Sequence, residues 1–183
     1  MTVFLSPEQM YKVVHSPGFT LDKLNVHISQ NFTWAEVFHF RTLYEVQQAD
    51  FKIFQNAFSQ SGLLERVRTY LTQKLGRPAV MIVTSWYRSL AANLAAHGSG
   101  HSAHLEALAT DFVVQGFESE DGNRYIQALL IPFVFPASFC LELTGGKWTH
   151  VDSRVFRFVF DMNGHVLTGE EQKAFMQKWG RHV

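Results

Sequence analysis

Two short segments of the chain carry side chains that could bind a metal ion. Residues 102–111 contain His104 and Asp111, and residues 148–152 contain His150. Zinc binds imidazole nitrogens and carboxylate oxygens, and a catalytic zinc has three protein ligands with a fourth position open to water. The residue types therefore make His104, Asp111 and His150 candidate zinc ligands.

The second segment reads as a β-strand with its polar residues on one side. Alternation along a strand puts His150 and Asp152 on the same face. If that face is buried, the charges need partners, because an unpaired buried charge is costly. A metal ion would supply a partner for them. A salt bridge, for instance with Arg88 or Arg154, would supply another.

The composition narrows the class of protein. The chain has 183 residues, 46% of them hydrophobic, which predicts a single folded domain over residues 1–183. Lys and Arg together number 16, as do Asp and Glu, so no overall charge favours nucleic acid or an anionic membrane as partner. Cys140 is the single cysteine, which excludes an internal disulfide and a cysteine-based metal site. Its apolar neighbours predict a buried, inert thiol.

The first residues, 1–6, lack a basic stretch followed by a long apolar run. The sequence therefore predicts no signal peptide and no membrane span. We expect synthesis in a cytoplasm, so that an extracellular role would need release or transport by another protein.

Capping signals and periodicity predict helices mainly in the first part of the chain. The expected helices cover residues 7–14, a short element after Thr33 with Glu36 closing its capping box, 49–58, 63–75, 118–130, and a last helix from Thr168 to about Trp179. Residues 59–62, Ser-Gln-Ser-Gly, are expected to separate two of these helices.

Strand signals dominate the second part of the chain. They predict strands at 79–84, buried on both faces, and at 109–114, 139–143, 148–152 and 155–160, with a hairpin turn at 161–164. Helices followed by an antiparallel sheet predict an α+β fold, in which the sheet packs against helices. The expected core spans about residues 25–160, and residues 155–180 form a C-terminal hairpin and helix.

An ordered set of motifs resembles the zinc peptidases of the M15 group, which include D-Ala-D-Ala carboxypeptidases and phage endolysin-type peptidases. The matching residues are Ser85-x-Tyr87-Arg88-Ser89, Asn93, Gly98 to Gly100, Ser102-x-His104-x6-Asp111 and Trp148-x-His150-Val151-Asp152-x-Arg154. The resemblance covers roughly residues 25–157. It implies the fold shared by hedgehog signalling domains and D-Ala-D-Ala peptidases.

The resemblance also implies a function and a site. It implies zinc held by His104, Asp111 and His150, in a peptidase that cleaves stem or cross-link peptides of peptidoglycan and is encoded by a phage. It implies that Arg88 contacts a substrate carboxylate, with Ser102 and Tyr87 as further substrate-binding residues. A guanidinium offers a bidentate match to a carboxylate. Such a protein would be made in a host cytoplasm and act on the cell wall.

Three positions depart from the family pattern. Many members carry Asp or Glu as general base three residues before the second zinc histidine, where this chain has Lys147. Asp152 is the substitute base expected here, with ligand orientation or pairing to Arg154 as the alternative roles. Trp86 and Ala107 stand where members often have Gly. These departures motivate an alternative function, a catalytically impaired tail, virion or wall-binding protein whose partners include other virion proteins.

Overall fold

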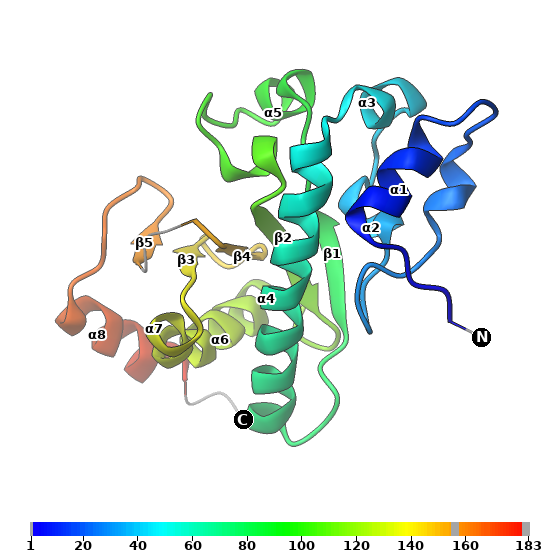
Figure 1. The fold of residues 1–183 in the computed structure, drawn as a ribbon. Helices are drawn as coiled ribbons and strands as arrows, with labels where there is room; N and C mark the ends of the chain where they lie inside the picture. Colours follow the sequence, from blue (N-terminus) through cyan, green and yellow to red (C-terminus); the bar gives the residue numbers. More distant parts are fainter. Residues whose placement is uncertain (1, 155–157, 181–183) are drawn as a thin grey trace. The chain divides into compact units, whose positions relative to one another are not determined.

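The computed structural model describes residues 2–154 and 158–180 (Figure 1). The chain divides into two compact units. The first unit comprises Met1–Glu65 and Ser85–Thr110, and the second comprises Arg66–Thr84 and Asp111–Val183. Each unit is therefore built from two separate stretches of chain. This division does not test the prediction of a single domain over residues 1–183, which stays a prediction.

Short capped helices make up most of the first unit. They are α1 (Pro7–Val14), η1 (Leu21–Leu24), α2 (Trp34–Val37), α3 (Leu43–Gln48), the first part of α4 (Phe51–Leu75), α5 (Leu90–Ala95) and η2 (Ala103–Glu106). The capping box predicted at Thr33 and Glu36 is confirmed at α2, and Ser6 forms the same kind of box with Gln9 at α1. Each box satisfies two backbone N–H groups that have no partner inside the helix.

Helix α4 is continuous over 25 residues, so the predicted break at residues 59–62 is wrong (Figure 1). One row of buried positions recurs at three- and four-residue spacing through the polar segment; it includes Phe54, Ala57, Ser61, Leu64, Val67 and Leu71. The Ser61 hydroxyl donates a hydrogen bond to the Phe58 carbonyl, 2.7 Å away, so it is satisfied within the helix. Burial of one face outweighs the weak helix propensity of Ser and Gly.

The second unit contains a five-stranded sheet. Its strands are β1 (Met81–Ser85), β2 (Ala109–Val114), β3 (Cys140–Leu143), β4 (Thr149–Asp152) and β5 (Val159–Asp161), in the order β1-β2-β4-β3-β5. The accompanying helices are α6 (Glu120–Leu130), η3 (Ile131–Phe133), α7 (Val134–Ala137) and α8 (Gly169–Trp179), and α6 packs against β3, β4 and α8. This arrangement confirms the α+β class.

Two details of the sheet differ from the prediction. β3 runs antiparallel to β4 but parallel to β5, so the sheet is mixed. β1 lies at one edge of the sheet. One of its faces is exposed: Ile82 is 45% exposed, as is Val80 just before the strand, whereas Met81 and Val83 are buried. An apolar run does not by itself distinguish a central strand from an edge strand.

The predicted C-terminal elements are also present in part. The Gly164 N–H donates to the Asp161 carbonyl at 3.0 Å, which closes the expected hairpin turn. Thr168 and Glu171 form the capping box that begins α8. Residues 155–157 of the strand predicted at 155–160 lie outside the described residues. Among the described helices, none is both long and apolar enough to cross a lipid bilayer.

Gly62 offers a test of the continuous helix. A Cβ built on Gly62 would have no heavy atom within 4 Å. We expect Gly62→Ala to raise the free energy of unfolding by about 0.5–1 kcal/mol, since alanine has less backbone freedom to lose in a helix. Urea unfolding measures the change. Gly76→Ala is the control and should destabilise, because Gly76 has φ +64°. A loss of stability in Gly62→Ala would contradict helical packing at this position.

Candidate metal centre

Two of the predicted ligands meet in the second unit. Asp111 lies in β2 and His150 in β4, which are neighbouring strands of the sheet. The His150 Nδ1 and Asp111 Oδ1 atoms are 2.7 Å apart, and both residues are buried. The sheet therefore presents one imidazole and one carboxylate to the same point.

Asp152 lies on the other side of the same imidazole. Its Oδ2 atom is 3.6 Å from His150 Nε2, as the alternation along β4 predicts. Burial would lower the pKa of His150, but the hydrogen bond with Asp111 and the charged contact with Asp152 outweigh burial and raise this pKa to about 10. Without a metal ion, His150 is thus an imidazolium held between two carboxylates.

Arg154 holds Asp152 by a bidentate contact. Its Nε is 3.0 Å from Asp152 Oδ1, and its Nη2 is 2.6 Å from Oδ2. The backbone N–H of Arg154 also donates to Oδ1. Burial would raise the pKa of Asp152, yet the contacts with His150 and Arg154 lower it to about 2. Asp152 is completely buried and stays charged at neutral pH.

Glu142 is a carboxylate that the sequence analysis did not single out. It pairs directly with His150 across β3 and β4, and directly paired residues present their side chains on the same face. Burial raises the pKa of Glu142; His150 opposes this shift, and Asp111 and Asp152 reinforce it. Within the part of the chain that the structure describes, no hydrogen bond or ion pair holds its carboxylate. One charged residue in the apolar strand 139–143 was the available signal.

His104 is the predicted ligand in the first unit. It lies in η2 and is buried, and its Nδ1 is 2.6 Å from the Trp86 carbonyl oxygen. A carbonyl oxygen only accepts hydrogen bonds, so Nδ1 carries the proton. Nε2 then keeps its lone pair, which is the state that a metal-binding histidine needs.

Two of the predicted substrate-binding residues, Arg88 and Ser102, contact the His104 backbone. The Arg88 N–H donates to the His104 carbonyl at 3.0 Å, and the Arg88 side chain donates from Nε to Ser85 Oγ at 2.7 Å. Ser102 caps η2, accepting from the His104 N–H. Tyr87 is mostly buried, and its ring lies edge-on to Phe38. Arg88 and Ser102 thus contact the His104 segment directly, whereas the observed contacts of Tyr87 are with Val37 and Phe38.

Asn93 explains why position 98, the first glycine of the Gly98 to Gly100 motif, must be a glycine. Its Nδ2 donates to the Ser99 carbonyl at 2.8 Å, and the Gly98 N–H donates to the Asn93 carbonyl at 2.8 Å. A Cβ at Gly98 would lie only 2.3 Å from Asn93 Oδ1, so only glycine fits. Asn93 therefore fixes the loop that leads into η2. His97 and His101, in the same loop, are exposed.

The three departures from the family pattern have local explanations. Trp86 is buried, and its indole donates to the Ala107 carbonyl at 3.1 Å, so its bulk lies in the core of the first unit. Ala107 has φ 56°, a conformation in which glycine is free of strain. Lys147 lies in the turn between β3 and β4 with an exposed side chain, where solvent screens its charge.

The donor set fits zinc. The chain offers two imidazoles and one carboxylate, from His104, Asp111 and His150, all of them buried. Ligands of a tetrahedral zinc lie about 3.3 Å from one another, given bonds of about 2.0 Å. The observed 2.7 Å between Asp111 Oδ1 and His150 Nδ1 would have to widen by about 0.6 Å to reach this separation. Histidines that bind zinc are commonly oriented by a carboxylate at their other ring nitrogen, and Asp152 occupies this position at His150.

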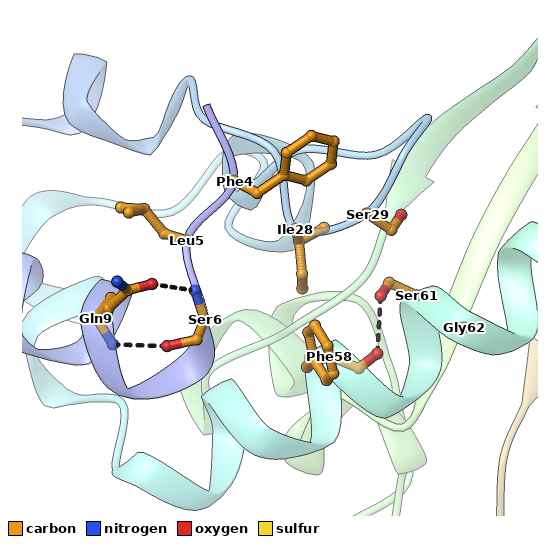
Figure 2. A pocket seen from close by; sticks show the side chains of 9 residues that line it. All are labelled: Phe4, Leu5, Ser6, Gln9, Ile28, Ser29, Phe58, Ser61 and Gly62. Atoms are coloured by element: carbon orange, nitrogen blue, oxygen red, sulfur yellow. Dashed lines mark hydrogen bonds between the residues drawn. The ribbon is translucent and has the colours of Figure 1, made fainter. Parts of the chain in front are cut away.

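A separate hollow of about 540 Å³ lies in the first unit (Figure 2). Its lining residues are Phe4, Leu5, Ser6, Gln9, Ile28, Ser29, Phe58, Ser61 and Gly62. None of the residues predicted for the site belongs to this lining.

Comparison with known proteins assigns the family. The family model Peptidase M15 matches residues 36–152, which is more than half of the chain. The chain therefore belongs to the peptidase M15 family, as the motifs predicted. Peptidases of this family are typically zinc-dependent, so membership supports a zinc peptidase in general. No curated protein and no solved structure matches the chain.

The buried charges predict an acid-sensitive fold. The pKa of Asp152 is lowered to about 2 from 3.8, so its stabilising effect is present above about pH 4 and disappears as the pH falls towards 2. We expect metal-free protein to lose about 2 kcal/mol of unfolding free energy over this interval beyond the loss in Asp152→Asn. Urea unfolding at several pH values measures the difference. Parallel pH profiles for the two proteins would contradict the assigned ion pairs.

Proposed function

We propose that this chain is a zinc-dependent peptidase that cleaves stem or cross-link peptides of peptidoglycan, and that it is encoded by a phage. The observation that carries the proposal is the buried donor set of His104, Asp111 and His150 in a chain of the peptidase M15 family. These three residues would hold the zinc. A bound zinc would lower the pKa of its water and polarise the scissile carbonyl.

The protein's own side chains would orient the ligands and the substrate. The Trp86 carbonyl fixes the proton of His104 on Nδ1, and Asp152 fixes the orientation of His150. Arg88 would bind a substrate carboxylate with its planar guanidinium, beside Ser102 and Tyr87. Stem peptides of peptidoglycan carry free carboxylates, which is why this arginine favours them as substrates.

Two carboxylates are candidates for the general base. Asp152 is the candidate from the sequence, but Arg154 binds both of its carboxylate oxygens. The lowered pKa of Asp152 also makes this carboxylate a weak base. Glu142 faces the same side of the sheet as His150, and its pKa is raised by burial. A general base works best when its pKa lies near the working pH. These contacts favour Glu142 as base and Asp152 as the residue that orients His150.

The alternative function is a virion or wall-binding protein without hydrolytic activity, acting alongside other virion proteins. Lys147 and Trp86 motivate this alternative from the sequence. The structure weakens this motivation. The Lys147 side chain is exposed to solvent, and the Trp86 side chain is buried in the core of the first unit. Metal content without wall hydrolysis would be its distinguishing result.

Zinc content and wall hydrolysis together test the proposal. We expect about one zinc per chain and release of amino groups from purified cell walls. His104→Ala should lose both, because it removes one of three ligands. His101→Ala is the matched control, since His101 is an exposed histidine three residues earlier, and it should keep both. Wild-type protein that binds zinc and releases no amino groups would refute the peptidase.

A pair of variants separates the two candidate bases. We expect Glu142→Gln to keep its zinc and to lower kcat about a hundredfold or more, because proton transfer is lost. Asp152→Asn should mainly weaken zinc binding, about 10- to 100-fold, because a carboxylate that orients a ligand is lost. Zinc titrations and steady-state kinetics measure the two effects. Full activity in Glu142→Gln, with loss of kcat in zinc-loaded Asp152→Asn, would assign the base to Asp152.

A further inference from the structure

Arg154 is only partly used by its contact with Asp152. The contact occupies Nε and one N–H of Nη2, which form one edge of the guanidinium. A guanidinium has five N–H donors, so the second edge, with Nη1, remains for another acceptor. In the described part of the chain no hydrogen bond to Nη1 of Arg154 occurs, and the side chain is 42% exposed.

The same arginine lines a pocket of about 370 Å³ in the second unit. The other described lining residues are Cys140, Phe158, Phe160, Gly164 and Val166. Cys140 is neutral at physiological pH, because burial raises its pKa to about 11. Arg154 is therefore the one charged group among the described residues of an otherwise apolar lining.

This combination matches one class of ligand. A pocket of this volume is at the small end of the range for bound ligands, so it suits a single small residue better than a long segment. Apolar walls suit a small apolar side chain, and the outer edge of the guanidinium suits a carboxylate. Asp152 already balances the charge of Arg154, so attraction would come from directed hydrogen bonds more than from a long-range field.

We propose that this pocket binds the free carboxylate of a peptide's terminal residue, with Arg154 as the recognising group and a small apolar side chain against Phe158, Phe160 and Val166. The inference rests on the proposed function, since it assigns a second carboxylate site, besides Arg88, to a peptidase substrate. Arg154 also contacts Asp152, which in turn faces His150, so the pocket adjoins the proposed zinc ligands of the second unit.

The test uses N-acetyl-alanine and N-acetyl-alaninamide, which differ only in the carboxylate. The full chain is titrated without added metal, because zinc would itself bind a carboxylate, and binding is followed by NMR. We expect the acid to bind about tenfold tighter than the amide, the effect of one charge-assisted hydrogen-bond pair. Equal binding of the two probes would overturn the proposal.

Matched variants locate the effect. Arg154→Lys keeps a cation for Asp152 but removes the outer edge, so the preference for the acid should disappear. Arg124→Lys is the control, because Arg124 lies in α6 of the same unit and pairs with Asp121. It should keep the preference. A preference that persists in Arg154→Lys would assign carboxylate recognition to another residue, such as Arg88, and overturn the proposal.

A second variant covers the case in which Arg154→Lys does not fold. Val166→Trp places a large ring in the pocket from a partly exposed position and leaves the pair of Arg154 and Asp152 intact. It should abolish binding of both probes, and unchanged binding would overturn the proposal. Failure of the peptidase would appear instead as missing zinc or missing wall hydrolysis, and neither changes this metal-free titration.

Discussion

The chain of charges from the buried residues Asp111, His150 and Asp152 to the partly exposed Arg154 is the interaction on which the second unit's site depends. It ties β2 to β4 and fixes the residues that follow β4. Removing one member of a buried pair leaves an uncompensated charge, which typically costs about 3–5 kcal/mol. A zinc ion at Asp111 and His150 would replace one contact in this chain without disturbing the remainder. The same residues therefore stabilise the second unit and would also hold the metal ion.

Secondary structure places these residues by simple spacing. Alternation puts His150 and Asp152 on one face of β4, and direct pairing with β3 adds Glu142 to that face. In the first unit, backbone groups orient the candidate ligand: the Trp86 carbonyl accepts a hydrogen bond from His104. The loop that Asn93 holds leads into η2, which contains His104. Orientation by main-chain atoms tolerates changes of side chain, which is consistent with a tryptophan at position 86.

The sequence predicted the family, the fold class, the capping boxes and β2, because each depends on local residue types or on closely spaced motifs. It did not predict the continuity of α4, where tertiary burial overrides the polar segment at residues 59–62. Nor did it predict that β1 is an edge strand or that β5 runs parallel to β3, since strand order depends on pairing between distant segments. Glu142 was missed for the same reason: only its register opposite His150 gives it significance.

Three positions that depart from the family pattern bear on whether the protein is active. The sequence treated Trp86 and Lys147 as obstacles, yet one side chain is buried in the first unit and the other is exposed to solvent. Ala107 keeps the left-handed backbone that glycine would adopt without strain, so the turn before β2 keeps its form at a small cost in energy. What the chain lacks at residue 147 is a carboxylate, and β3 provides one from a neighbouring strand at Glu142. Direct pairing with His150 puts the Glu142 carboxylate on the same face of the sheet as this histidine, whereas residue 147 lies in the turn before β4.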